Sequence, residues 1–375
     1  MSLGETPLTL AAENGNPTIV KDLLESGANA NAARRYNGET ALMLAARNGK
    51  PEVVKLLIDH GARVDATEGI RGQNALMWAA DAGKPEALEV LLQAGATPNV
   101  ASKSGFTPLI FASAKGSRDA VAALMSAGAD INQPNHAGMN PLLAAVALGK
   151  REVVELLVEK GADLSFRDPG GNTALHIAAE NGNLDLVKLF LEKKLDANAR
   201  TGTPVYAAPN AASQNITRPP GAAQTPLLLA AKGGYIQVMR TLIEAGADPT
   251  AEASDGTTLL LAAASGAKLE AVKYAYTLDR NVKAQTDYHR TVLHLALQGF
   301  NPTAAPVVEF LAGVGAELDT PDDGGDTPWD IAHLCSARED STKVLAKLFD
   351  AAGRQPRKHE IRINEGAGVS SETNK

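Results

Sequence analysis

One short motif recurs along this chain at nearly constant spacing, and this regularity limits the possible folds more than any other feature. The motif is Thr or Asn, then Pro or Ala, then Leu, with looser forms in the last three copies. Most intervals are 33 or 34 residues, and one of 52 corresponds to 33 plus an insertion of 19. The ten copies begin at Thr6, Thr40, Asn74, Thr107, Asn140, Thr173, Thr225, Thr258, Thr291 and Thr327. Such a period indicates a solenoid of stacked units, because no single unit can bury its own apolar face.

Within each copy, the residues predict two short helices joined by a turn. Thr and Asn are favourable N-caps, and proline is accommodated at the first helical position because its missing N–H is not needed there. A glycine nine residues after the Thr, such as Gly15 or Gly49, predicts the end of the first helix. The second segment has apolar residues at i, i+3 and i+4, as in Val54, Leu57 and Ile58. It usually ends in Gly-Ala, and a polar loop ending in glycine leads to the next unit.

The composition agrees with many thin helices rather than one thick core. Aromatic residues make up only 4% of the chain, although apolar residues reach 44%. Alanine and leucine, which are strong helix formers, dominate the first helices, as in residues 41–46. We therefore predict an all-α chain.

Residues 172–182 read Asn-Thr-Ala-Leu-His-Ile-Ala-Ala-Glu-Asn-Gly, which resembles the T-P-L-H-x-A signature of the ankyrin repeat. The resemblance extends over about residues 4–350 in ten registered copies. It implies an ankyrin-repeat solenoid of helix-turn-helix units, with two antiparallel helices per unit and a hairpin-like finger between units. We therefore assign residues 1–353 to a single ankyrin repeat domain. The polar residues 354–375 are expected to form a disordered C-terminal tail.

Two second helices lack the terminal glycine of the other copies. Lys-Leu at 194–195 and Asp-Arg at 279–280 stand where Gly-Ala is usual. Because these residues resist positive φ, we expect the two helix ends to differ in geometry. Near the C-terminus, three extra residues surround positions 300–302. The charged segment 343–350 is expected to form a terminal cap with a polar outer face.

The resemblance also implies that a partner binds the fingers and the short first helices of the concave face. The residue just before each Thr or Asn is exposed in the family pattern and is usually polar. Phe106 and Met139 break this rule in two neighbouring copies. Clustered apolar groups on a surface tend to mark interfaces, so both residues enter the candidate site.

The fingers before the second and third repeats are each one residue longer than the others. One carries Arg34, Arg35 and Tyr36, and the other carries Ile70 and Arg71. Tyr and Arg are the residue types most enriched at binding hot spots, although a longer finger can also be a tolerated insertion without function. The candidate face runs across repeats two to five, and its first-helix positions are Arg47, Asp81, Lys115 and Leu148.

The 19-residue insertion lies near residues 199–222, in the finger before the seventh repeat. Its prolines argue against a regular helix or strand. Long loops on a rigid scaffold are often functional, but many are merely mobile, and the sequence leaves both possibilities open. On the functional hypothesis, the insertion folds over the concave face or grips the partner, with Tyr206 and Arg218 among its contacts.

Aromatic and histidine side chains on the first helices have structural explanations beside functional ones. Trp78 and Phe111 occupy one column in adjacent repeats, as a ligand-stacking pair would. That column elsewhere holds Leu or Ile, which favours core packing. His176 and His294 lie at the histidine position of the repeat signature. We expect them to form structural hydrogen bonds rather than to act in catalysis or metal binding.

Residue patterns typical of active sites are missing from the sequence. The chain has no nucleotide-binding glycine loop, HExxH, paired CxxC or nucleophile elbow. His333 and Cys335 are two positions apart on an expected helix, so they do not face each other as a nucleophilic pair would. The acidic segment 319–330 resembles a calcium loop only faintly, since Pro321 occupies the third position and Asp330 the twelfth. We therefore predict no catalytic residue, no cofactor and no metal site.

Charge and hydropathy restrict the partners and the compartment. A formal net charge of −7 argues against a nucleic-acid partner, and no 18-residue apolar run predicts a membrane span. Residues 1–5 show no leader, so the chain is expected in the cytoplasm, or in the periplasm or outside the cell if a leader has been removed. Caps at both ends oppose further stacking, so we expect a monomer.

Together these features predict a non-enzymatic module that binds a protein partner through its fingers and concave first-helix face. The alternative is a regulatory or substrate-recruiting subunit of an enzyme complex. A third hypothesis, an enzyme or ligand receptor that uses the insertion as a lid, is disfavoured because no constellation of titratable residues is evident. The fold by itself does not identify the partner.

Overall fold

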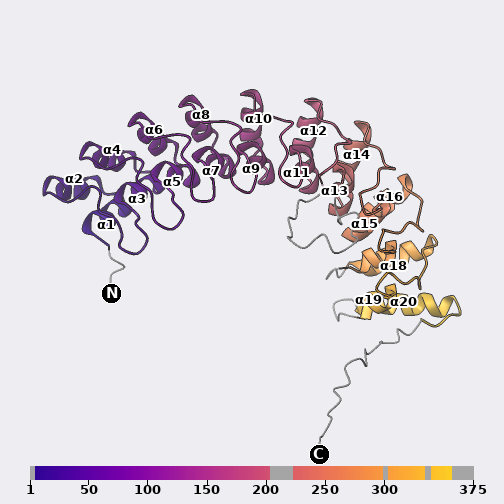
Figure 1. Ribbon diagram of the computed structural model, residues 1–375. Coiled ribbons are helices and arrows are strands. Elements are labelled where there is room, and N and C mark those ends of the chain that lie inside the picture. Colours follow the sequence, from indigo (N-terminus) through magenta and orange to yellow (C-terminus); the bar gives the residue numbers. More distant parts are fainter. Residues whose placement is uncertain (1–4, 203–222, 299–302, 334–338, 357–375) are drawn as a thin grey trace, which may run out of the picture. The chain divides into compact units, whose positions relative to one another are not determined.

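The computed structural model describes residues 5–202, 223–298, 303–333 and 339–356 (Figure 1). In these segments the regular secondary structure is helical, with no strand and three isolated β-bridges. The predicted all-α repeat fold is therefore confirmed. The chain divides into two compact units, of which the first contains residues 1–230 and 237–248 and the second contains residues 231–236 and 249–375.

Every repeat contributes a first helix that begins directly after the Thr or Asn of the motif. The predicted caps are present: the Thr6 hydroxyl accepts the N–H of Thr9 at 3.2 Å, and Asn74 Oδ1 accepts the N–H of Met77 at 3.0 Å. Gly83 ends its helix at a φ of +66°, which a residue with a side chain rarely adopts. The first helices are α1 (Pro7–Asn14), α3 (Ala41–Arg47), α5 (Ala75–Ala82), α7 (Pro108–Lys115), α9 (Pro141–Ala147), α11 (Ala174–Glu180), α13 (Pro226–Gly233), α15 (Leu259–Gly266), α17 (Val292–Leu297) and α19 (Pro328–His333).

The second helices are amphipathic, as their spacing of apolar residues predicts. In α10, for example, Val154 and Leu157 are buried while Glu152 and Glu155 are exposed. The second helices are α2 (Pro17–Glu25), α4 (Pro51–Asp59), α6 (Pro85–Gln93), α8 (Arg118–Ser126), α10 (Arg151–Glu159), α12 (Leu184–Glu192), α14 (Ile236–Glu244), α16 (Leu269–Leu278), α18 (Ala304–Gly313) and α20 (Glu339–Ala351).

In the first unit, the first helices pack in one row and the second helices pack in another. Helices α1, α3, α5, α7, α9 and α11 contact one another in turn, and α2, α4, α6, α8 and α10 do the same (Figure 1). Ala45, Ala79 and Leu88 are among the fully buried side chains. Small residues in the first helices permit close packing, so the core is shared between neighbouring repeats.

The fingers between repeats are short loops closed by a backbone hydrogen bond. In the first finger, the Arg34 N–H donates to the Glu39 carbonyl at 2.8 Å. A further bond joins this finger to the next one, from the Gly69 N–H to the Asn37 carbonyl at 2.9 Å. Adjacent fingers at this end of the first unit therefore stand side by side.

The finger before the seventh repeat keeps this closure in spite of its insertion. The Thr201 N–H donates to the Gln224 carbonyl at 2.9 Å, and the Gln224 N–H donates to the Thr201 hydroxyl at 2.9 Å. These residues are 23 positions apart, whereas Ser102 and Phe106 of a regular finger are four apart, which accounts for the 19 extra residues. The insertion predicted near 199–222 therefore has its base at Thr201 and Gln224. Residues 203–222 lie outside the described segments.

The two second helices without a terminal glycine end in different ways. Lys194 adopts a φ of +65°, in the same left-handed region as Gly161 at +89°. The predicted change of geometry at Lys194 is therefore wrong, because the closing bond from the Leu195 N–H to the Phe190 carbonyl is retained at 3.0 Å. Asp279 instead caps α16 in an extended conformation at φ −123°, so the predicted difference is confirmed there.

In the second unit, α15, α17 and α19 form one row and α16, α18 and α20 form another. The segment 343–350, predicted as a terminal cap, is the C-terminal part of α20, which begins earlier, at Glu339. Helix α20 buries Leu345 and Phe349, and the Phe349 ring lies edge-on to Trp329 with centroids 5.6 Å apart.

The described structure continues a few residues into the predicted tail. The Arg354 guanidinium contacts the Asp319 carboxylate at 3.3 Å, so this residue is ordered against the last finger. The rest of the predicted disordered tail, residues 357–375, lies outside the described segments. Residues 299–302 and 334–338 also lie outside them. Among the described helices, none has the length and apolarity that crossing a membrane requires.

Candidate functional site

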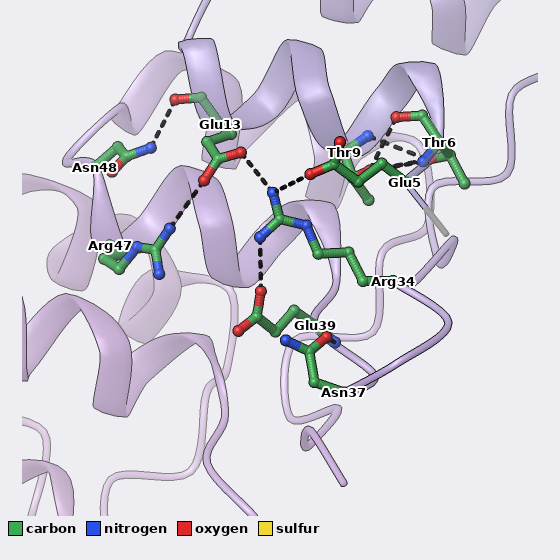
Figure 2. Close-up of polar contacts among 9 residues, drawn as sticks. All are labelled: Glu5, Thr6, Thr9, Glu13, Arg34, Asn37, Glu39, Arg47 and Asn48. Carbon is green, nitrogen blue, oxygen red and sulfur yellow. Dashed lines mark hydrogen bonds and ion pairs between the residues drawn. The ribbon is translucent and has the colours of Figure 1, made fainter. Parts of the chain in front are cut away.

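Arg34 lies at the centre of a cluster of ion pairs that joins the first finger to α1 (Figure 2). Its guanidinium contacts the carboxylates of Glu5 at 2.9 Å, Glu13 at 2.5 Å and Glu39 at 2.8 Å. The Arg34 side chain is only 14% exposed, so solvent screens these pairs less than pairs at an open surface. The cluster therefore holds the finger against the first helix.

Glu13 extends this cluster toward the next repeats. Its carboxylate contacts Arg47 on α3 at 3.1 Å, and its backbone carbonyl accepts an N–H of the Asn48 side chain at 2.6 Å (Figure 2). Arg47 in turn lies over the indole ring of Trp78 on α5, with the guanidinium carbon 4.9 Å from the ring centroid. A cation at this distance is attracted to the electron-rich ring face. A chain of contacts thus runs from α1 through α3 to α5.

A cavity of about 310 Å³ lies beside Trp78, between the first helices and the fingers of the neighbouring repeats. The Trp78 N–H is buried and has no hydrogen-bond partner among the described residues. Arg71 and Asp81 form no ion pair within the described segments. The cavity therefore combines an aromatic surface with unpaired charges of both signs. Six of its lining residues are Asn37, Arg47, Ile70, Arg71, Trp78 and Asp81.

Glu68 fixes the shape of the second finger from inside. Its buried carboxylate accepts the backbone N–H groups of Ile70 at 2.6 Å, Arg71 at 2.7 Å and Gln73 at 2.9 Å. Burial alone would raise the pKa of this carboxyl, but the three N–H groups and the charge of Lys103 outweigh it and lower the pKa below its usual value. The ionised carboxylate thus fixes the backbone at Ile70 and Arg71, which both line the cavity.

Most of the contact residues predicted in repeats two to five lie at the surface. Tyr36 is 83% exposed, Ile70 59% and Leu148 58%. Arg34 is placed differently, because its guanidinium is buried in the ion-pair cluster and supports the finger instead of facing solvent. The remaining charged candidates are at least partly exposed, namely Arg35, Arg47, Arg71, Asp81 and Lys115. Tyr206 and Arg218 lie outside the described residues, and a role in partner binding stays a prediction for every residue of this set.

The residue before each Thr or Asn was expected to be exposed, and this expectation is wrong. Phe106 and Met139 are both half-buried. The Phe106 carbonyl closes its finger by accepting the Ser102 N–H, and its ring stacks on Phe111 with centroids 5.3 Å apart. The column is half-buried in the other repeats as well, because its residues close the finger and face the first helix. These two side chains are therefore less accessible than Tyr36 and Ile70.

Trp78 and Phe111 are also placed differently from the prediction of core packing. Both are half-buried, whereas Leu44 in the same column is fully buried. Trp78 lines the cavity and lies beneath Arg47, which a leucine at this position would not attract. The apolar residue of this column is thus part of the core in repeats such as that of Leu44, whereas Trp78 and Phe111 form part of the surface.

His176 forms the structural hydrogen bonds predicted for it. Its Nε2 donates to the carbonyl of Ala199 at 2.9 Å and lies 3.2 Å from that of Gln224, while Nδ1 accepts the Thr173 N–H at 3.2 Å. Burial lowers the pKa of His176 to about 4, so the ring is neutral near pH 7. His294 has equivalent bonds in the second unit, to Thr291 and to the Asp326 carbonyl. Within the described segments, no group of three or more His, Cys, Asp or Glu side chains is arranged to hold a metal ion.

The sequence analysis did not select Glu5, Glu13 or Gln73, although they support or line the site. A signal for Glu13 was present, because Glu13, Arg47 and Asp81 occur 34 residues apart in one column and alternate in charge. Opposite charges in neighbouring repeats of one column lie near each other on a stacked surface. Glu5 offered no comparable signal, since its contact with Arg34 depends on how the finger folds back.

Comparisons with known proteins bear on the repeats rather than on the cavity. The model of a family described as ankyrin repeats (three copies) matches residues 2–68, 65–135, 129–201, 145–253 and 227–322. No curated protein matches the chain. The matched ranges overlap and together cover most of the sequence, including every repeat that contributes to the cavity.

Proposed function

The chain belongs to the ankyrin repeat family, whose repeats are generally protein-binding modules, and we propose that it is a non-enzymatic module of this kind. The proposed binding surface is the face formed by the fingers and first helices of repeats two to five, which we call the finger face. The observation that carries the proposal is the exposure of Tyr36, Ile70 and Leu148 on this face. Tyr36 and Ile70 lie on adjacent fingers, and neighbouring large apolar side chains that are exposed are typical of interfaces.

The state of the titratable groups also supports a binding role. Among the described residues with shifted pKa values, His176 and Glu68 use their polar atoms to hold fingers in place. An acid–base catalyst instead needs a shifted group that can reach a substrate. The charged residues at the cavity, Arg71 and Asp81, are exposed and suit recognition.

The experiment that tests this proposal is affinity capture from a lysate of the native organism. Wild type is compared with the triple variant Tyr36→Ala, Ile70→Ala, Leu148→Ala, and circular dichroism checks that both are folded. Ile19→Ala is the matched control, because Ile19 is an exposed apolar residue on α2, away from the finger face. We expect a partner that wild type and the control retain and the triple variant loses. Equal capture by all three chains would contradict the finger face as the binding surface.

The same capture addresses the alternative function, a regulatory or substrate-recruiting subunit. A catalytic protein recovered with wild type at fixed stoichiometry favours that alternative. A non-catalytic partner, or several partners that compete for the finger face, favours the general binding module.

A further inference from the structure

Three successive fingers of the first unit present positive charge to solvent. Arg35, Arg71 and Lys103 are exposed, and none of them forms an ion pair with a described carboxylate. Lys103 does donate a hydrogen bond to the Gly69 carbonyl, but a carbonyl does not neutralise its charge. Because the whole chain carries a net charge of −7, this local excess of positive charge runs against the overall balance.

Glu39 and Glu68, on the first two of these fingers, are less exposed than the three cations, and their carboxylate oxygens already have partners within the chain. The Glu39 carboxylate is held by Arg34 at 2.8 Å. The Glu68 carboxylate accepts three backbone N–H groups and is buried. A ligand that approaches the finger tips therefore meets cations whose charges are available and carboxylates that are already satisfied.

Two large apolar side chains stand between these cations. Tyr36 follows Arg35, and Ile70 precedes Arg71. They occupy equivalent places in adjacent fingers, which the Gly69-to-Asn37 backbone bond holds together at 2.9 Å. Exposed apolar groups framed by unpaired charges of one sign fit a ligand that has apolar and oppositely charged groups side by side.

The cavity behind these fingers has room for a single bulky side chain. At about 310 Å³ it is at the lower end of the sizes typical of binding pockets. Trp78 offers an aromatic surface there, and Asp81 offers a carboxylate that can accept an N–H from a peptide backbone. Arg47 is held over Trp78 by Glu13, so the aromatic surface has a fixed position.

From this arrangement we infer that the partner presents an acidic peptide segment with a large apolar side chain between or beside its carboxylates. The carboxylates bind Arg35 and Arg71, and the apolar side chain enters the cavity beside Trp78. The inference rests on the proposed function, because it specifies the ligand of the same finger face. A single-stranded nucleic acid would also carry negative charge and stack on Tyr36. The peptide is favoured because the Asp81 carboxylate beside the cavity can accept a backbone N–H, a donor that a peptide carries at nearly every residue and a sugar-phosphate backbone lacks.

A peptide-display selection on the full chain tests the inference. A random 12-residue peptide library is selected on wild type, on the charge reversal Arg35→Glu, Arg71→Glu, and on a matched reversal, Lys55→Glu, Lys188→Glu. Lys55 and Lys188 are exposed on second helices, so the two double variants have the same net charge. We expect wild type and the matched reversal to select peptides with Asp or Glu beside an aromatic or large aliphatic residue. The best such peptide should bind Arg35→Glu, Arg71→Glu at least about tenfold more weakly.

A second variant separates the pocket from the charges. Trp78→Leu is compatible with the fold, because leucine occupies the same position at Leu44 and Leu229. This variant should keep the preference for acidic residues and lose the preference for an aromatic one. Peptides selected without an acidic bias, or bound equally by the Arg35→Glu, Arg71→Glu variant, would overturn the inference. Tighter binding of a fluorescent 20-nucleotide oligo-dT than of any selected peptide would overturn it in favour of nucleic acid.

Failure of the inference and failure of the proposed function are distinguishable. If the native partner is lost by the Tyr36, Ile70, Leu148 triple variant and retained by Arg35→Glu, Arg71→Glu, the binding face is correct and the acidic ligand is wrong. If neither variant loses the partner, the proposed finger face is itself wrong.

Discussion

The first repeat and the repeat that begins at Thr173 hold their fingers in place by different physical means. In the Thr173 repeat, the third helical residue is His176, and its ring reaches the finger carbonyl of Ala199 at 2.9 Å. In the first repeat the same position is Thr9, whose hydroxyl accepts the Thr6 N–H at 2.9 Å and donates to the Thr6 carbonyl at 2.9 Å, so its bonds stay within the helix start. There the finger is held instead by the ion pairs of Arg34 (Figure 2).

The comparison shows that a finger of this fold can be held either by a neutral hydrogen-bonded histidine or by ion pairs. The two kinds of contact respond differently to pH and salt. The buried histidine works only while it is uncharged, so acid weakens it. The Arg34 cluster depends on charge, and its carboxylates are partly exposed, so salt weakens it.

The largest effect is expected when the ionic support is removed. Arg34→Met leaves the carboxylates of Glu5, Glu13 and Glu39 close together without their shared cation. We expect the local stability of α1 and the first finger to fall by about 3 kcal/mol, since breaking a mostly buried ion pair strands its partners. Amide hydrogen exchange measured by mass spectrometry reports this loss repeat by repeat.

Arg35→Met is the control for that experiment. Arg35 is the exposed neighbour of Arg34 in the same finger and forms no ion pair in the described structure. Its replacement should change local stability by no more than about 0.5 kcal/mol. Equal exchange rates in the Arg34→Met and Arg35→Met chains would show that the ion pairs do not stabilise the first finger.

The next effect concerns the hydrogen bonds by which the neutral His176 ring supports its finger. They can be removed by the substitution His176→Leu or, in wild type, by acid. At pH 7 we expect this variant to be less stable than wild type by about 2 kcal/mol, because the buried carbonyls of Ala199 and Gln224 lose their donor. The folded-state pKa of His176, about 4, is below its usual 6.5, so the unfolded chain binds the proton first as pH falls. Wild type therefore loses stability between pH 6.5 and 4, by about 2 kcal/mol at pH 5.

The decisive comparison is the difference between the two chains at each pH. Both chains are unfolded in urea at pH 7 and at pH 5, and amide hydrogen exchange in α11 is measured under the same conditions. Titrating groups that the two chains share contribute equally to both, so they cancel in the difference. The two should become about equally stable at pH 5. A difference that stays constant would mean that His176 does not titrate with a lowered pKa.

These two supports also show how far the sequence could predict the structure. The position of His176 in the repeat signature was enough to predict its structural role, because its partners are set by the repeat itself. The role of Arg34 was not predictable in the same way, because its burial depends on carboxylates from a finger and a helix that converge only after folding. The caps of the first helices follow from local rules, and they were predicted correctly. The half-burial of Phe106 instead depends on how its finger folds back onto α7, and that of Trp78 on Arg47 of the neighbouring repeat.

A smaller effect is expected in the second finger, where a carboxylate provides the support. Glu68→Gln replaces charge-assisted bonds to the N–H groups of Ile70 and Arg71 with weaker neutral ones. We expect a local loss of about 1 kcal/mol, measured as faster exchange of these two amides. Glu89→Gln, at an exposed site on α6, is the control.

Acid should distinguish this finger from the one held by His176. The lowered pKa of Glu68 means that its contribution is present above the usual glutamate pKa and is lost only as pH falls through the lower folded-state value. At pH 5 the second finger of wild type should therefore keep its protection while the finger at Ala199 loses some of its own. Loss of protection in both fingers at pH 5 would contradict this assignment.

The smallest effect is expected at the ends of the second helices, where the two repeats differ once more. The first repeat has Gly27 at a φ of +86°, and the Thr173 repeat has Lys194 at +65°. A residue with a side chain is strained in this region by about 1 kcal/mol. Lys194→Gly relieves that strain but adds freedom to the unfolded chain, so we expect a net gain of only about 0.5 kcal/mol.

The reciprocal change, Gly27→Ala, tests the same cause from the other side. A Cβ built at Gly27 meets no atom within 4 Å beyond its two neighbours in the chain, so any loss of stability there is conformational and not steric. We expect a loss of about 1 kcal/mol, measured with Lys194→Gly by urea unfolding at pH 7. If Gly27→Ala destabilises while Lys194→Gly also destabilises, the lysine side chain makes a contact that outweighs its strain. If both changes follow the expected signs, backbone conformation alone explains why this position is glycine in most repeats.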